Sequence, residues 1–503
     1  MKRPKKVLLV DLPTYDPHRN YSDVESDLRE LYAFKIPLVT ALWETRTGIK
    51  LKRPSNYYSR GLLSIAACLE KQGFEVQYLS YAQPGGPQQF SRAVMNSDVM
   101  GITAMTPTFL DAKYLCYRAK EIKPEIVTVL GGPHINALPE ASLRECPEAD
   151  FVMVGECDWR LGRLLGSLET PESVAGVYYR DQKEIIHSSR MPLEPVDVRE
   201  LPMPAYHLLG DLRPYMHNIR TARGCPGACS FCCEAGSYHG QGSIHTTAQI
   251  LGELKFLREH GVDAGSLIHF SDSSVLMHRS RIVKLLKAAG DLGFYYSGDA
   301  RADNIVSTDG NDLREMRKAG FVWYRIGFES AIPEVLADTQ KRMTHEEQVA
   351  ACAKIRDADP RAAIMAYMVT GLPGSNPENL ATQLGTIRNL IRTETVDTVG
   401  NKTFVPYPGT PCYQNGAKYG LTLRRWPDSS WNKFDRVSVP VFDLDGMGAE
   451  QIQQAFFMAE EAVMLETAAK LCQLGIHKVP LQGNGYWSKH YAAGNKAGQY
   501  LCI

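Results

Sequence analysis

The stretch RGCPGACSFCCEAG, residues 223–236, places four thiols within one short loop: Cys225, Cys229, Cys232 and Cys233. The preceding residues NIRTAR have the pattern of a β-strand, so the loop should lie at the carboxyl end of that strand. A structural zinc site normally takes its four ligands as two pairs, and no second Cys or His pair follows at a suitable spacing. A redox CxxC motif leaves the third and fourth thiols unexplained. Three thiolates at CxxxCxxC spacing can instead hold three irons of a four-iron, four-sulfur cluster.

Composition limits the classes of protein to consider. The chain has 503 residues, 44% of them apolar, and its 56 basic residues balance its 56 acidic residues. This length suggests roughly three structural units, and the neutral charge disfavours nucleic acid as the main partner. The opening residues MKRPKKVLLVDLP are typical of a first buried strand rather than a secretory signal, and no apolar run is long enough to span a bilayer. We therefore expect a cytoplasmic protein without an integral membrane segment, in which clustered cysteines bind metal or catalyse.

The residues before the loop alternate strand and helix patterns up to about residue 190. Strand patterns at 6–12, 74–81, 97–105, 125–132 and 149–156 predict a doubly wound parallel sheet, which is a Rossmann-like α/β fold. Such sheets bind ligands beyond the carboxyl ends of their strands. Three loops lie there: TPTF after Met105, GGPH at 131–134 and GECD at 155–158. The glycine pair in the second loop is equally consistent with a simple tight turn. Five prolines between residues 188 and 215 indicate an extended linker that runs over the protein surface.

The residues after the linker repeat the alternation with a longer period. Six strand patterns at roughly 30-residue spacing, from residue 216 to residue 407, predict a partial (β/α)6 TIM barrel that is open on one side. After residue 412 the alternation stops, and a long amphipathic helix at 449–475 indicates a mainly helical C-terminal cap. We interpret the cap tryptophans Trp426, Trp431 and Trp487 as core or interface residues. The predicted domains are therefore 1–187, a linker at 188–215, the barrel at 216–412 and the cap at 413–503.

The cysteine loop on the first strand of such a barrel resembles the radical S-adenosylmethionine superfamily. That resemblance implies that Cys225, Cys229 and Cys232 ligate a 4Fe-4S cluster, that Phe231 is the family's aromatic residue, and that Cys233 is a spare thiol. The open iron would chelate S-adenosylmethionine, which is cleaved to a 5′-deoxyadenosyl radical. The resemblance further implies S-adenosylmethionine contacts near the carboxyl ends of the later strands, at Asp272, Arg301, Glu329, Gly371 and Pro373.

An α/β domain ahead of this barrel resembles the cobalamin-dependent branch of the same superfamily. The resemblance implies a cobalamin site at the sheet's carboxyl edge, formed by Thr106, Gly131, Gly132, His134, Gly155 and Glu156. Relatives that ligate cobalt carry DxHxxG after the first strand, whereas this chain reads DPHRNY, with Tyr21 in place of the glycine. We therefore expect base-off cobalamin without a ligand from His18.

Together these resemblances imply a radical S-adenosylmethionine enzyme that methylates an unactivated carbon of a small-molecule or natural-product substrate. An electron donor such as flavodoxin or ferredoxin would reduce the cluster, and nucleic acid would play no part. Two alternatives remain open: oxidation, cyclisation or ring rearrangement without methyl transfer, and a non-catalytic regulator that binds cobalamin. Methylthiotransferases share the domain order but carry a second cluster on N-terminal cysteines. Here Cys68, Cys116, Cys146 and Cys157 lack matching loops, which disfavours that class.

Overall fold

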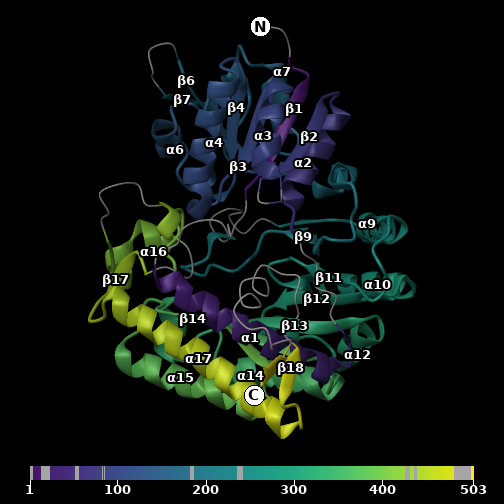
Figure 1. Ribbon diagram of the computed structural model, residues 1–503, viewed down its shortest axis with the longest axis vertical. Helices are drawn as coiled ribbons and strands as arrows, with labels where there is room; N and C mark the ends of the chain where they lie inside the picture. The colour runs from purple at the N-terminus through teal and green to yellow at the C-terminus, as the bar shows by residue number, and fades with distance from the viewer. Residues whose placement is uncertain are drawn as a thin grey trace.

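The structure is a computed structural model that describes residues 4–12, 23–50, 56–81, 83, 85–181, 186–234, 242–424, 431–434, 439–480 and 500–502. Two α/β units lie one above the other, the N-terminal unit at the top of Figure 1 and the barrel below it. His18, Trp426 and Trp487 lie outside the described residues. Within the described ranges no helix is long and apolar enough to cross a membrane.

The N-terminal unit is built on a seven-stranded sheet with the order β2-β1-β3-β4-β5-β6-β7. The first five strands are parallel, which confirms the predicted doubly wound sheet, and β6 and β7 extend it as an antiparallel edge that the sequence did not predict. The strands are β1 (Lys6–Asp11), β2 (Glu75–Ser80), β3 (Val99–Thr103), β4 (Val127–Gly131), β5 (Phe151–Met153), β6 (Val177–Arg180) and β7 (Ile186–Ser188).

Helices cover both faces of this sheet because its strands are apolar on both sides. Along β1, Leu8 and Val10 pack on one face, whereas Val7 and Leu9 pack on the other. One face is covered by α3 (Gly86–Met95), α4 (Phe109–Ile122), α5 (Pro133–Ala137) and α6 (Pro139–Glu145), and the other by α2 (Arg60–Lys71) and α7 (Arg160–Gly166). Short 3-10 segments are η1 (Thr106–Thr108) and η2 (Pro171–Ser173).

The second unit confirms the predicted six-stranded open barrel. All its neighbouring strands are parallel, in the order β15-β14-β13-β12-β11-β8. The strands are β8 (His217–Ile219), β11 (Leu267–Phe270), β12 (Tyr295–Ala300), β13 (Phe321–Glu329), β14 (Ala363–Thr370) and β15 (Thr398–Thr403). Between β8 and β11, β9 (Ala222–Arg223) and β10 (Ser243–Ile244) form a separate antiparallel pair at the barrel mouth.

Helices follow the barrel strands and bury their apolar faces against the sheet. These are α9 (Thr247–Glu259), α10 (Arg279–Ala289), α11 (Ala302–Val306), α12 (Gly310–Lys318), α13 (Pro333–Asp338), α14 (His345–Ala358) and α15 (Pro377–Arg392), with the 3-10 segments η5 (Val275–His278) and η6 (Gly290–Leu292). Strand β13 alternates accordingly: Tyr324, Ile326 and Phe328 are fully buried in the main core cluster, whereas Arg325 and Glu329 are only half-buried on the opposite face.

The open side of the barrel is covered by two long helices from opposite ends of the chain. In Figure 1, α1 (Asp23–Thr47, purple) and α17 (Ala449–Gln473, yellow) run side by side across the barrel. The buried Lys35 ammonium of α1 pairs with the buried Glu460 carboxylate of α17 at 2.7 Å. Trp43 packs against Trp323 of β13, with ring centroids 5.9 Å apart. Helix α1 thus packs on the barrel, although its residues fall within the predicted domain 1–187.

The remaining C-terminal elements lie at two places: those before α17 lie near the barrel mouth, whereas β18 and β19 follow α17, where Val479 packs with Leu38 and Leu42 of α1. They are α16 (Pro411–Gln414), η7 (Gly416–Tyr419), the antiparallel pair β16 (Leu421–Leu423) and β17 (Phe442–Leu444), η8 (Trp431–Lys433), and the antiparallel pair β18 (Lys478–Pro480) and β19 (Tyr500–Cys502). The long helix α17 matches the predicted helix at 449–475.

The proline-rich segment 188–215 is more buried than the predicted surface linker. It contains η3 (Val198–Glu200) and η4 (Tyr206–Leu209), and Val198 and Tyr206 are fully buried. The Tyr206 hydroxyl donates a hydrogen bond to Glu253 of α9. Prolines set an extended backbone here, and the residues between them fill the junction of the two units.

Candidate active site

The cysteine loop begins at the barrel mouth, where the chain leaves β9 through Gly224 at φ 89°. Two backbone hydrogen bonds fix the loop from opposite sides. The Ser230 N–H donates to the Thr339 carbonyl at 3.1 Å, and the Cys412 N–H donates to the Ser230 carbonyl at 3.1 Å. The loop is therefore held between the end of α13 and the start of α16.

Two of the three predicted ligand thiols lie on either side of Gly227. A Cβ atom at Gly227 would lie 3.3 Å from Cys225 Sγ, 4.0 Å from Cys229 Sγ and 3.5 Å from Arg301 Nη1. The Gly227 N–H also donates to Cys225 Sγ at 3.4 Å. Burial raises the pKa of the Cys229 thiol, and the nearby cations Lys341 and Arg301 oppose that rise. These cations favour the thiolate form that binds iron.

The donor set of this loop fits a 4Fe-4S cluster. Cys232 follows Cys229 in a turn, where its N–H donates to the Cys229 carbonyl at 3.1 Å. Across the described part of the chain, no three His, Cys, Asp or Glu side chains already stand close enough to share one metal ion. In a cluster each thiolate binds a different iron, so its ligands need not converge as tightly as those of a single ion. Phe231 is half-buried and packs on an apolar cluster that includes Leu372 and Ile452.

Glu329 lies beside the cysteines at the end of β13. Its φ of 66° lies in the left-handed region, which a residue with a side chain rarely adopts. Its Oε1 accepts a hydrogen bond from Lys341 Nζ at 2.9 Å, and the Lys341 ammonium is almost completely buried. Strained backbone of this kind often occurs at functional sites. The sequence did not point to Lys341, because it follows α13 and lies at no strand end.

Asp272 follows β11, as predicted, but its carboxylate holds the backbone that leads into the cysteine loop. It accepts hydrogen bonds from the Thr221 N–H at 2.8 Å, the Thr221 hydroxyl at 2.7 Å and the Ala222 N–H at 2.7 Å. Burial raises the pKa of this carboxyl group, and the three hydrogen bonds counteract the rise. These contacts make Asp272 a positioning residue for the strand that carries the cysteines.

Arg301 lies at the end of β12, close to the cysteines. Its guanidinium pairs with Asp303, with Nη2 and Oδ2 2.7 Å apart, and its backbone N–H donates to the Ser274 hydroxyl. The fifth strand is followed by Gly371, whose φ is 80°. A Cβ atom there would lie 2.5 Å from Ile452 Cγ2 of α17, so the close packing of α17 requires a glycine at this position. Pro373 follows in the same loop.

The predicted cobalamin residues fall at the carboxyl edge of the N-terminal sheet. His134 of α5 is buried, stacks on Phe109 at 4.3 Å between ring centroids, and lies 3.3 Å from the Thr106 hydroxyl through Nδ1. Burial lowers the pKa of His134 to about 4. Trp431 of the C-terminal segment covers the same imidazole, with centroids 4.9 Å apart, and its indole N–H donates to Glu145. The sequence did not predict that the C-terminal segment reaches this edge.

Two of the three predicted glycines at this edge, Gly132 and Gly155, have identifiable structural roles. A Cβ atom at Gly132, whose φ is 104°, would lie 2.7 Å from the Ala104 carbonyl oxygen. The Gly155 N–H donates to the Asn136 side chain at 2.8 Å. At Gly131 the nearest atom to such a Cβ is 3.8 Å away, which leaves room beside the chain.

Glu156 points toward the barrel. Its Oε1 accepts a hydrogen bond from Arg223 Nη1 at 2.7 Å, and its Oε2 accepts one from the Val196 N–H at 3.1 Å. A second contact joins the two units: a Cβ atom at Gly409, in the loop after β15, would lie 3.1 Å from Ala137 Cβ, in the segment after β4. The carboxyl edge of the N-terminal sheet therefore faces the mouth of the barrel (Figure 1).

Family comparisons agree with this two-part geometry. Residues 46–164 match the B12 binding domain model, and residues 219–383 match the Radical SAM superfamily model. A protein of Pyrococcus horikoshii, named as an uncharacterized methyltransferase, is 26% identical over 366 residues, which cover 71% of this chain and 76% of that protein. The anaerobic magnesium-protoporphyrin IX monomethyl ester cyclase of Rubrivivax gelatinosus is 27% identical over 305 residues, covering 57% of this chain and 53% of the cyclase. This chain thus aligns with about half the length of that cyclase.

Solved structures show the same fold over most of the chain. The radical S-adenosylmethionine methyltransferase TsrM of Kitasatospora setae, with cobalamin and a 4Fe-4S cluster bound, superposes with a TM-score of 0.65 at 14% identity, covering 92% of this chain and 89% of that chain. The cobalamin-dependent enzyme OxsB, with aqua-cobalamin and S-adenosylmethionine bound, gives a TM-score of 0.65 at 14% identity, covering 87% of this chain and 64% of that chain. A B12-binding domain whose ligand edge faces a radical S-adenosylmethionine barrel identifies the chain as an enzyme of the cobalamin-dependent radical S-adenosylmethionine family.

Proposed function

We propose that this enzyme methylates an unactivated carbon of a small-molecule or natural-product substrate. One observation carries the proposal: the carboxyl edge of the B12-binding sheet lies directly over the barrel mouth that holds the cysteine loop. Ligands of both folds bind at these strand ends. Methyl transfer to a substrate radical needs the two cofactors in one cavity, because reacting atoms must approach to roughly 3–3.5 Å.

The chain's own residues take distinct parts in this scheme. Cys225, Cys229 and Cys232 ligate the cluster, and Lys341 and Arg301 hold positive charge beside it. When bound, the cluster and S-adenosylmethionine supply a 5′-deoxyadenosyl radical, and cobalamin supplies the methyl group. We assign further S-adenosylmethionine contacts to the barrel mouth, at Phe231, Asp272, Arg301, Glu329, Gly371 and Pro373. We assign cobalamin contacts to the facing sheet edge, at Thr106, Gly131, Gly132, His134, Gly155 and Glu156.

Named relatives support methyl transfer but also keep a second reaction class in view. Besides the Pyrococcus horikoshii protein, the matches include a cytidylyl-2-hydroxyethylphosphonate methyltransferase and a hopanoid C-2 methylase. The cyclase of Rubrivivax gelatinosus supports oxidation or cyclisation without methyl transfer as the second candidate. We further propose a small-molecule substrate, a cytoplasmic location, and flavodoxin or ferredoxin as the electron donor.

The deciding experiment is anaerobic turnover of the enzyme loaded with cobalamin and reconstituted with iron and sulfide, using S-adenosylmethionine labelled in its methyl group. The substrate panel follows the names of the relatives and solved structures: cytidylyl-2-hydroxyethylphosphonate, a hopanoid, magnesium-protoporphyrin IX monomethyl ester and tryptophan. We expect label in the product, with one 5′-deoxyadenosine and one S-adenosylhomocysteine formed per product.

Other outcomes would redirect the assignment. An unlabelled product formed with 5′-deoxyadenosine alone would favour the oxidation or cyclisation reading. Intact cofactor binding without cleavage of S-adenosylmethionine under any condition would favour the cobalamin-binding regulator. The variant Cys229→Ala is the matched control, because it should abolish cleavage while the cobalamin domain stays intact.

A further inference from the structure

We propose that Arg223 positions the cluster loop against the cobalamin domain, and that Asp158 and Glu156 hold it there. The proposal rests on the proposed function only in assuming that both cofactors bind, because it concerns how the two cofactor sites are held in a fixed position relative to each other. Arg223 belongs to β9 and lies two residues before Cys225. Its two partners lie in the loop directly after β5, at the ligand edge of the B12-binding sheet.

The contacts form a forked pairing across the domain junction. Arg223 Nη1 donates to Glu156 Oε1 at 2.7 Å and to Asp158 Oδ2 at 2.9 Å, while Nη2 donates to Asp158 Oδ1 at 3.1 Å. Such a fork fixes direction as well as distance, which a lysine in the same place would not do. Ser64 of α2 donates to Asp158 Oδ1 at 2.6 Å, so the acceptor is itself fixed within the N-terminal unit.

The pairing is also shielded from water. The side chains of Arg223 and Asp158 are 10% and 5% exposed, and that of Glu156 is 19% exposed. The two carboxylates hold the pKa of the guanidinium above its usual range despite burial. A buried pair of this kind is weak evidence for stability, but removing either partner leaves the other charge buried without its counter-ion.

Asp272 holds the same strand from the barrel side. It binds the backbone of Thr221 and Ala222, while the next residue, Arg223, binds the N-terminal unit. The strand is therefore fixed to both domains immediately before the chain turns at Gly224 into Cys225. Any shift of Arg223 is passed on to the first cluster ligand, Cys225, through Gly224 alone. A misplacement of about 1 Å can lower a reaction rate by about 100-fold.

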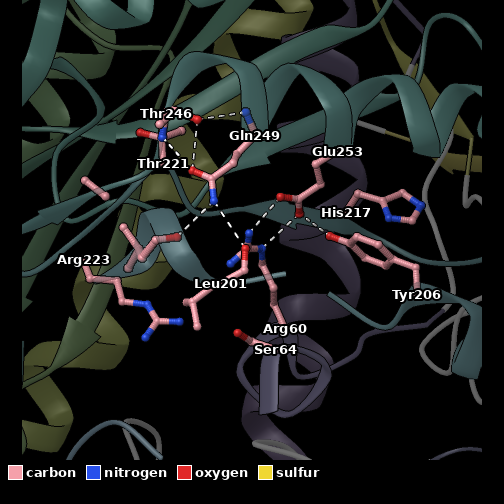
Figure 2. A network of polar contacts seen from close by, with 12 residues as sticks. Arg60, Ser64, Leu201, Tyr206, His217, Thr221, Arg223, Thr246, Gln249 and Glu253 are labelled. Atoms are coloured by element: carbon pink, nitrogen blue, oxygen red, sulfur yellow. Dashed lines mark hydrogen bonds and ion pairs between the residues drawn. The ribbon is translucent and has the colours of Figure 1, made fainter. Parts of the chain in front are cut away.

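A second buried ion pair joins the two units through other elements and supplies a matched control. Figure 2 shows Arg60 of α2 pairing with Glu253 of α9, together with Tyr206 of segment 188–215. The Arg60 and Glu253 side chains are 13% and 4% exposed, much like the Arg223 pairing, and Arg60 Nη2 lies 2.8 Å from Glu253 Oε2. Neither residue lies in the strand or loop that carries the cluster ligands.

The test uses the full-length protein in two states, with Arg223→Gln, Asp158→Asn and the control Arg60→Gln. In protein without cofactors, amide hydrogen exchange is followed over residues 224–234. In protein loaded with cob(II)alamin and a reduced cluster, pulsed electron paramagnetic resonance reports the distance between cobalt and cluster. Neither readout requires a substrate or methyl transfer, so failure of the proposed function leaves both interpretable.

We expect Arg223→Gln to raise exchange in the loop at least tenfold and to lengthen or broaden the cobalt–cluster distance. Asp158→Asn should give the same changes in smaller degree, because Glu156 still holds the arginine. The double variant Arg223→Gln with Asp158→Asn should show the same loop exchange and cobalt–cluster distance as Arg223→Gln alone, since the two residues act through one contact. Arg60→Gln should lower the thermal midpoint while leaving loop exchange and distance as in the unmodified enzyme.

Two results would overturn the proposal. One is an unchanged loop exchange and cobalt–cluster distance in a folded Arg223→Gln variant. The other is an equal change in Arg60→Gln, which would show a general docking effect rather than local positioning. If Arg223→Gln fails to fold, Asp158→Asn decides the question by the same two measurements, and an unchanged distance in it would then count against the proposal.

Discussion

The cysteine loop gives the sharpest prediction about single residues. Changing Cys225, Cys229 or Cys232 to alanine should abolish cluster binding and cleavage of S-adenosylmethionine, because each thiolate ligates a different iron. Cys233→Ala is the control and should retain about four irons per chain, the content expected of one cluster. Iron analysis and anaerobic 5′-deoxyadenosine formation measure both effects. Loss of the cluster in Cys233→Ala alone would show that a different set of thiols is used.

Lys341 leads to a prediction about redox poise. Its ammonium pairs with Glu329 and opposes the burial that raises the pKa of Cys229. Reduction adds negative charge to the cluster, so removal of this cation should make reduction harder. Lys341→Met should therefore lower the midpoint potential by roughly 40 mV, equivalent to about 1 kcal/mol for one electron. Lys341→Arg, which keeps the charge, should restore most of the shift in a redox titration, and a rise in potential on removing the cation would contradict the argument.

At this scale the sequence predicted residue types better than it predicted contacts. The spacing of Cys225, Cys229 and Cys232 is local, so it could be read directly. The hydrogen-bond partners of Asp272 and Glu156 could not be predicted from the sequence, because these side chains bind backbone or arginine atoms from distant segments. Lys341 and Arg223 were missed for the same reason: nothing local marks a cation whose partner lies in another element.

Among the elements, α1 and α17 depend on each other across the barrel's open side. Lys35→Met should destabilise the protein by about 3–5 kcal/mol, because it leaves the Glu460 carboxylate buried and without its ammonium partner. The double variant Lys35→Met with Glu460→Leu should recover most of that loss, since an apolar pair removes the unpaired charge. Free energies of unfolding in urea test both. Additive losses in the double variant would show that the two side chains do not act as a pair.

The contact between η8 and α5 predicts a pH dependence. Burial lowers the pKa of His134 from its ordinary 6.5 to about 4 in the folded protein. The stability that this shift contributes is therefore fully present above pH 6.5 and is lost as the pH falls toward 4, up to about 3 kcal/mol. Trp431→Ala should expose the imidazole and move its pKa back toward 6.5. Free energies of unfolding, measured between pH 4 and 7.5 for the unmodified protein and for His134→Gln, test this pH dependence. Parallel curves for these two proteins would show that His134 does not cause it.

Element prediction succeeded where the pattern was local. All five strands predicted for the N-terminal sheet and all six predicted for the barrel appear. The first barrel strand, β8, is shorter than the strand predicted at 216–224. Strands β6 and β7 were missed because, apart from the buried Val177, their residues are half-buried or exposed and form no continuous apolar run. The place of α1 could not be predicted, because its packing partners on α17 lie at the far end of the chain.

At the scale of the whole molecule, the arrangement predicts how cobalamin is held. The full-length protein should bind cobalamin in the base-off state, and His18→Ala should leave the visible absorption spectrum unchanged. The reason is that residues 16–21, DPHRNY, lack the glycine of the cobalt-ligating pattern. The intact chain is the proper material for this test, because α1 of the N-terminal half packs on the barrel. A spectral shift in His18→Ala would identify that histidine as a cobalt ligand.

The pairing of α1 with α17 also bears on how the protein is made. Lys35 and Glu460 are separated by 425 positions, so the first helix leaves the ribosome long before its partner is synthesised. At about 5–20 residues per second, that interval is roughly 20 to 85 seconds. During this time α17 is not yet available to cover the open side of the barrel, and the apolar side chains of α1 that pack on α17 remain exposed. Nascent chains of this protein should therefore be clients of chaperones until translation is nearly finished, whereas the B12-binding sheet, whose last strand ends at Ser188, can pair all its strands much earlier.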